Sequence, residues 1–151
     1  MKAVIQRVNG AELSVDGESK AIIGRGLVVY VGIEQPDTEA DVIALCKKVS
    51  AMRIFSDDAG KMNLSVADIR GEILLVSNFT LCADISHGNR PSFSAAMRPV
   101  MQASVMFDYC VEVMRDLMRA AGLADNVKCG IFGADMRIDQ SNDGPVTIIY
   151  P

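Results

Sequence analysis

Short apolar runs alternate with turn-forming residues through the first third of the chain, which is the pattern of consecutive β-strands. Turn signals stand at Asn9-Gly10 and Asp16-Gly17. Turns this short predict antiparallel pairing of the strands that they join. Residues 27–33 are continuously apolar, which predicts a central strand buried on both faces. The predicted strands comprise residues 2–8, 12–15, 21–23 and 27–33.

Two later stretches carry the spacing of amphipathic helices. Asp37 or Thr38 can cap a helix that is predicted to run to about Met52. A second helix is predicted over residues 99–122, with a proline at its start and a glycine at its end. Apolar residues recur at intervals of three and four in both segments, so each helix has one face to bury. The two stripes are Val42, Leu45, Val49 and Met52, and Ala103, Met106, Cys110, Val113, Leu117 and Ala120.

Further strands are predicted after each helix, at residues 72–83, 127–132, 136–139 and 146–150. Strands therefore outnumber helices, and the sequence predicts a single α+β domain over residues 1–151. Its sheet is expected to be curved, barrel-like and mostly antiparallel, with the two main helices packed on one face. Two helices cannot cover the whole sheet, so a second copy of the chain is the simplest cover, and a homodimer is predicted.

Composition narrows the range of functions. The chain of 151 residues has a net charge of −4, which argues against a protein that coats a nucleic-acid backbone. It still permits a protein that binds only an RNA end through a few basic residues, for which Arg7, Lys61 and Arg90 are candidates. The four cysteines form no C-x-x-C pair and there is one histidine, so neither a metal nor another cofactor is predicted. With no apolar run long enough to span a bilayer and no signal peptide, the predicted location is the cytoplasm.

The sequence lacks the usual signs of a nucleophilic hydrolase. No G-x-S-x-G elbow is present, and a Ser-His-Asp triad would need His87, which stands in a polar loop and is expected to be exposed. The segment Ser77-Asn78-Phe79-Thr80 is more unusual, because an apolar strand ends there in small polar residues. Either the strand end simply reaches solvent, or it forms a pocket floor whose backbone N–H groups stabilise an oxyanion.

A second candidate segment precedes the last predicted strand. Residues 141–147 read Ser-Asn-Asp-Gly-Pro-Val-Thr, which is also the composition of a plain turn. The Gly144-Pro145 bond can adopt either the cis or the trans form, and the sequence leaves both open.

Seven segments, taken in order, resemble the D-aminoacyl-tRNA deacylases from end to end. They are MKAVIQRV at 1–8, RIF at 53–55, GKMNLS at 60–65, VSNFTL at 76–81, GNRPSF at 88–93, FGADM at 132–136 and NDGPVT at 142–147. The resemblance implies hydrolysis of the ester bond of D-aminoacyl-tRNA and glycyl-tRNA, with rejection of L-aminoacyl groups. It also implies a homodimer that binds the tRNA 3′ end in active sites shared across the subunit interface.

The resemblance assigns roles to particular residues. It places catalysis at Ser77, Asn78, Phe79 and Thr80, with Asn78 where the family's motif has Gln. Thr80 is expected to position groups rather than attack the ester, because no base adjoins it in the sequence. The pair Gly144-Pro145, in the cis form, would enter the partner's pocket and read chirality. Met136 would line the site of the terminal adenine, and Arg7 would brace the Gly-Pro loop.

Two other functions remain open at this point. One is a hydrolase of small esters, which would not need tRNA. The other is a non-catalytic module that binds aminoacyl-tRNA or other RNA, and the shortened side chain of Asn78 favours it.

Overall fold

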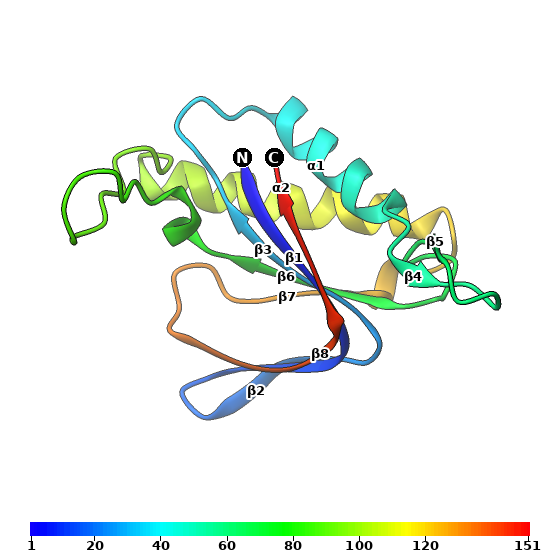
Figure 1. Cartoon of the computed structure of the whole chain (residues 1–151). Helices are drawn as coiled ribbons and strands as arrows, with labels where there is room; N and C mark the ends of the chain where they lie inside the picture. The colour runs from blue at the N-terminus through cyan, green and yellow to red at the C-terminus, as the bar shows by residue number, and fades with distance from the viewer.

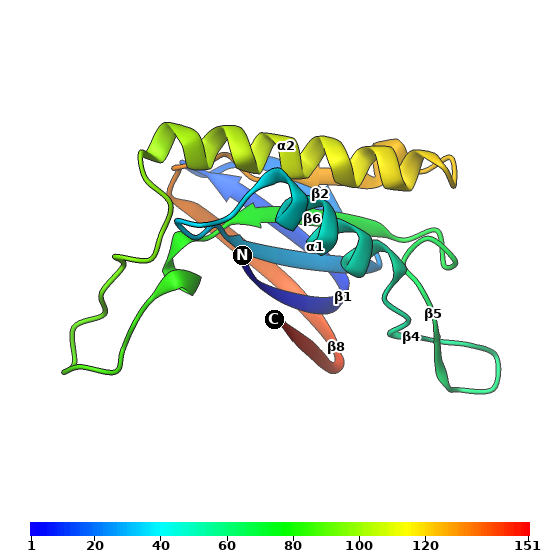
Figure 2. The same cartoon turned by 90° about the horizontal axis from the view of Figure 1, so that it is seen from above.

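The computed structural model describes residues 1–151 as one α+β unit with two long helices beside a strongly curved sheet (Figure 1). The sheet is nearly closed and barrel-like, and both helices lie on the same side of it (Figure 2). The strands are β1 (Lys2–Val15), β2 (Glu18–Ile23), β3 (Gly26–Gly32), β4 (Phe55–Ser56), β5 (Met62–Leu64), β6 (Glu72–Ser77), β7 (Val127–Cys129) and β8 (Met136–Tyr150). The helices are α1 (Glu39–Ala51) and α2 (Val100–Arg119), with 3₁₀ turns η1 (Phe79–Cys82) and η2 (Ala124–Asn126).

The main sheet is mixed, with three antiparallel strand pairs and two parallel ones. Its order is β2-β1-β3-β6-β7, and β8 pairs with β1. Strand β1 is antiparallel to β2, β3 and β8, whereas the β3–β6 and β6–β7 pairs are parallel. The reason is that α1 lies between β3 and β6 in the chain, and α2 lies between β6 and β7. Such helical crossovers return the chain in the same direction, so the rule drawn from short turns applies only to the first strands.

Three predicted boundaries are wrong for a shared reason. Strand β1 continues through Asn9-Gly10, where its register with β8 shifts instead of turning. The last two predicted strands are one strand, β8, which continues through residues 141–147. The strand predicted over residues 72–83 ends at Ser77 and gives way to η1. In the first two cases, pairing with a distant strand overrides the local turn residues. In the third, the strand ends because such pairing is lost.

Both predicted helices are present, but the stripe predicted for the second is displaced: α2 buries Phe107, Cys110, Val111, Met114 and Met118, and only Cys110 belongs to the predicted stripe. Thr38 is the N-cap of α1 and forms a capping box with Asp41. Beneath α1 and α2 lies the larger core, to which β3 contributes Leu27, Val29 and Val31. The alternate β3 residue Val28 belongs to a second core inside the curve of the sheet. The central strand is therefore buried on both faces, as its continuous apolar run predicts.

Strand β8 is the exposed edge of this fold. It pairs with β1 only, so its other edge has no partner strand. The side chain of Ile149 on it is 73% exposed. No helix in the fold combines the length and the hydropathy that crossing a membrane would require.

Candidate active site

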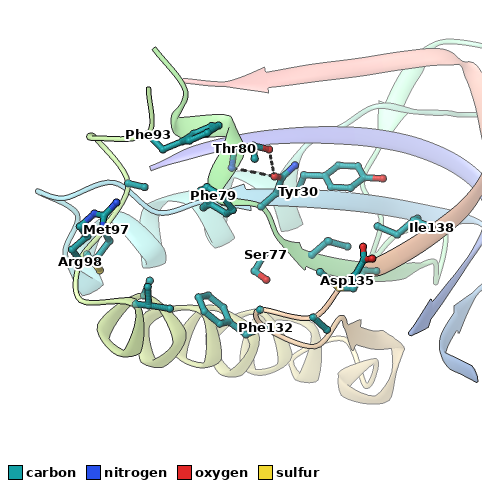
Figure 3. A pocket seen from close by; sticks show the side chains of 18 residues that line it. Tyr30, Ser77, Phe79, Thr80, Phe93, Met97, Arg98, Phe132, Asp135 and Ile138 are labelled. Atoms are coloured by element: carbon teal, nitrogen blue, oxygen red, sulfur yellow. Dashed lines mark hydrogen bonds between the residues drawn. The ribbon is translucent and has the colours of Figure 1, made fainter. Parts of the chain in front are cut away.

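A cavity of about 670 Å³ opens at one end of the sheet, where β6, η1, the start of α2 and the β7–β8 loop meet (Figure 3). Its walls are mostly apolar, with a small number of polar groups, which is the usual character of a site for an organic ligand. Of the residues predicted for catalysis or substrate binding, the cavity brings together Ser77, Asn78, Phe79, Thr80 and Met136.

Asn78 organises the floor of the cavity. Its backbone N–H donates to the Val31 carbonyl at 2.8 Å, which fixes the end of β6 against β3. Its side-chain oxygen accepts hydrogen bonds from the Thr80 backbone N–H at 3.3 Å and from the Thr80 hydroxyl (Figure 3). Asn78 is thus the N-cap of η1. An amide oxygen is too weak a base to deprotonate a hydroxyl, so this contact orients Thr80 without activating it.

Phe79 supplies both a ring and a backbone donor. The ring is 59% exposed and meets Phe93 edge-on, with 5.1 Å between the ring centroids. Phe79 is the first residue of η1, so its backbone N–H has no acceptor inside that turn, whereas the N–H of Thr80 donates to Asn78. Such an N–H at the start of a helical turn, on a largely apolar wall, is suited to stabilise a developing negative charge on oxygen.

The β7–β8 loop and Tyr30 also line the cavity, with Tyr30 on the strand beside β6. The Tyr30 hydroxyl donates to Gln140 Oε1 at 2.9 Å, and Gln140 Nε2 donates to Asn142 Oδ1 at 2.8 Å. Burial raises the pKa of the Tyr30 phenol, so this hydroxyl stays protonated as a donor. The polar chain from Tyr30 to Asn142 connects the cavity wall to the start of the segment that holds Gly144.

Gly144 and Pro145 lie in a bulge of β8, away from this cavity. In the β1–β8 ladder Gln6 pairs with Thr147 and Val8 pairs with Asn142, so residues 143–146 protrude opposite Arg7. Both Gly144 and Pro145 are exposed, the peptide bond between them is cis, and Gly144 has a φ of +114°. Within one chain, the structure does not bring the Gly-Pro pair to the cavity floor.

Arg7 holds the base of this bulge. Its Nε lies 3.0 Å from Asp143 Oδ2 in an ion pair without hydrogen-bond geometry. Its Nη1 donates to the Ile54 carbonyl at 2.6 Å, and the residue is buried. The charge of Arg7 is therefore paired with Asp143 inside the protein, so Arg7 is not a basic residue available to bind RNA.

Other candidate chemistry lies outside the cavity. His87 is exposed in the loop between η1 and α2, as expected, and does not line the cavity. No group of three His, Cys, Asp or Glu side chains is placed to hold a metal ion, and all four cysteines are free thiols. Sequence reasoning gave no role to the other lining residues, among them Tyr30, Phe93, Arg98 and Phe132. Of these four, only Phe132 and Phe93 lie in segments that the resemblance had singled out.

Residues 4–151 match the protein family described as D-Tyr-tRNA(Tyr) deacylase. The chain is 49% identical over 149 residues to a D-aminoacyl-tRNA deacylase of Chlorobaculum parvum, covering 99% of this chain and 96% of that one. It is 48% identical to a D-aminoacyl-tRNA deacylase of Geobacter sulfurreducens, covering 99% and 93% of the two chains.

Solved structures with the same fold agree with this similarity. One, described as c-Myc DNA Unwinding Element Binding Protein, superposes with a TM-score of 0.92 at 41% identity and covers 100% of this chain and 98% of that chain. Another, a probable eukaryotic D-amino acid tRNA deacylase, has a TM-score of 0.82 and covers 99% and 97%. At 17% identity, the second shows likeness of fold alone.

Proposed function

The chain belongs to the D-Tyr-tRNA(Tyr) deacylase family and is a hydrolase that cleaves the ester bond of D-aminoacyl-tRNA, and we propose that cleavage takes place over Ser77–Thr80. The observation that carries this placement is the Phe79 N–H, which has no acceptor inside η1, beside a Thr80 hydroxyl that Asn78 holds in place. An aminoacyl ester is already activated, so its hydrolysis needs a positioned water and a stabilised oxyanion more than a strong nucleophile.

In the proposed reaction, water attacks the ester carbonyl, and the negative charge that develops on the carbonyl oxygen is stabilised by the Phe79 N–H. The ester C–O bond then breaks, the ribose oxygen of the tRNA takes up a proton, and the free amino acid leaves. No imidazole lines the cavity, and the neighbouring hydroxyl of the terminal ribose is a group that can assist the proton transfer. The apolar walls at Phe132 and Met136 suit the flat face of the terminal adenine.

The chirality of the amino acid is read, in this proposal, by a second copy of the chain. The Gly144-Pro145 bulge is exposed and lies away from its own cavity, so it is placed to enter another molecule's cavity. The unpaired edge of β8 and its exposed Ile149 offer a surface for that association. Carbonyl groups of the bulge would accept hydrogen bonds from the substrate's α-ammonium group and fill the volume that an L side chain needs. Glycine has no side chain to exclude, so glycyl-tRNA is also a substrate.

The experiment that tests this function is deacylation of matched D-tyrosyl-, L-tyrosyl- and glycyl-tRNA by the purified protein. Rapid release of D-tyrosine and glycine, with L-tyrosyl-tRNA left intact, is expected. Equal hydrolysis of D- and L-tyrosyl-tRNA, or cleavage of simple esters alone, would indicate a general esterase. Tight binding without release would indicate an RNA-binding module.

The proposed dimer leads to a separate prediction. Sedimentation of the protein at micromolar concentration is expected to give the mass of two chains, because the site is incomplete in one. Replacing the exposed Ile149 with Lys should weaken that association, while the equivalent change at the exposed Ile22 serves as the control on another strand. A monomer that is fully active at this concentration would contradict the proposal.

A third prediction concerns Thr80. If its hydroxyl only positions groups, Thr80→Ala should retain D-specific hydrolysis at a rate roughly 2- to 13-fold lower, the usual effect of losing one hydrogen bond. Single-turnover rates on D-tyrosyl-tRNA measure the effect. Complete loss of activity, together with an aminoacyl ester trapped on Thr80 of the unmodified protein, would establish covalent catalysis instead.

A further inference from the structure

Arg98 is held at the cavity by contacts to its backbone rather than to its side chain. Its backbone N–H donates to Gln35 Oε1 at 3.0 Å, and Gln35 Nε2 donates to the Arg98 carbonyl at 3.4 Å. The preceding residue, Met97, is buried, and its N–H donates to the Ile33 carbonyl at 2.9 Å. The chain entering α2 is therefore fixed to the segment after β3, with the Arg98 side chain on the cavity wall (Figure 3).

The guanidinium group of Arg98 has no counter-charge within the protein. No acidic side chain forms an ion pair with it, and the first turn of α2 carries no acidic residue. Arg98 and Asp135 are the only charged residues that line the cavity, and Figure 3 shows them at opposite ends with Ser77 between them. In a chain of net charge −4, this places one unmatched positive charge at one end of the cavity and a negative charge at the other.

The other bases proposed from the sequence do not provide such a group. Arg7 is buried and paired with Asp143. Lys61 belongs to the β4–β5 hairpin, which projects from the opposite end of the fold from the cavity (Figure 1). Arg90 lies in the exposed loop before α2 and does not line the cavity. An acidic protein needs a local positive charge to bind an RNA end, and Arg98 is therefore the residue placed to supply it.

We propose that Arg98 binds the phosphodiester on the 5′ side of the terminal adenosine of the substrate; this inference rests on the proposed function. With the ester at Ser77–Thr80, that phosphodiester is the first negative charge met along the RNA. A guanidinium group binds a phosphate through two parallel hydrogen bonds, and Asp135 repels a phosphate from the other end. The RNA strand consequently enters from the side of the α2 N-terminus, and Arg98 determines this direction.

Two minimal substrates distinguish binding of the phosphodiester by Arg98 from other effects of this residue on the site. One is adenosine esterified with D-tyrosine, which carries no phosphate. The other is the dinucleotide cytidylyl-(3′→5′)-adenosine with the same ester, which carries a single phosphodiester. Arg98→Gln should raise KM for the dinucleotide by roughly 10-fold or more, with kcat unchanged, because a charged hydrogen-bonded contact is lost. Kinetics on the phosphate-free nucleoside should not change.

The control variant is Arg119→Gln at the other end of the same helix, where the exposed Arg119 pairs with Asp116; it should leave both KM values unchanged. On full-length D-tyrosyl-tRNA, Arg98→Gln should also reduce the slope of log KM against log salt concentration by about 0.7, the value for one single-strand phosphate contact. Equal effects on the two minimal substrates, or an unchanged salt slope, would overturn the assignment. Inactivity of the unmodified protein on D-tyrosyl-tRNA would instead refute the proposed function.

Discussion

Gly144→Ala is expected to lower the turnover of D-aminoacyl-tRNA by about 100-fold or more, because a displacement of roughly 1 Å at a positioned site has an effect of that order. Gly144 has a φ of +114°, a conformation that L-residues rarely adopt. A Cβ added there would lie 3.0 Å from Val146 Cγ2 and 3.2 Å from Arg7 Nη2. Arg7 is held by Asp143 and the Ile54 carbonyl, so the bulge must move instead.

The fold should survive this change, since residues 143–146 protrude from the β1–β8 ladder and Gly144 is exposed. Gly60→Ala is the matched control. Gly60 also has a positive φ, +76°, but no atom lies within 4 Å of its added Cβ, and it stands in the turn between β4 and β5. Single-turnover deacylation and circular dichroism of both variants give the comparison. Full activity of Gly144→Ala, or an equal loss in Gly60→Ala, would remove the bulge from the proposed site.

The sequence predicted those parts of the fold that local pattern determines. The continuous apolar run of residues 27–33 became β3, and Thr38, one of the two predicted capping residues, caps α1. The path of β8 was beyond such reasoning. Its 15 residues include Asp143, Gly144 and Pro145, which read as a turn; they bulge out of the ladder, and the strand continues because the residues on both sides of them pair with β1. The parallel pairs likewise depend on crossovers that no short window of sequence contains.

The candidate site, too, could be predicted from the sequence only in part. Ser77–Thr80 and Met136 line one cavity. The apolar strand that ends in polar groups marked the first four residues as a candidate, and the family resemblance singled out Met136. Sequence reasoning missed Arg98 because the feature that marks it is the lack of an acidic side chain that pairs with it. An arginine without an ion pair, on a cavity wall, can be recognised only when the surrounding acidic residues have been placed in space.

A second large effect is expected for Phe79→Pro, which removes the backbone N–H that the proposed mechanism uses. Loss of one oxyanion donor typically lowers kcat by about 100- to 1,000-fold. Proline suits the first position of a helical turn, and the Phe79 ring is mostly exposed, so the backbone should keep its course. Phe79→Ala, which keeps the N–H, is the control and should lose far less activity. Equal losses in the two variants would assign the effect to the ring.

Mixed dimers of Gly144→Ala and Phe79→Pro chains, isolated through two different affinity tags, test the shared site most directly. Each variant alone should be almost inactive. In the mixed dimer, the intact floor of the Gly144→Ala chain receives the intact bulge of the Phe79→Pro chain, and the other site carries both defects. We expect roughly half the D-tyrosyl-tRNA hydrolysis of the unmodified dimer, from one working site of two. If each site were built within a single chain, the mixed dimer would be as inactive as its parents, and that result would contradict a site shared between two chains.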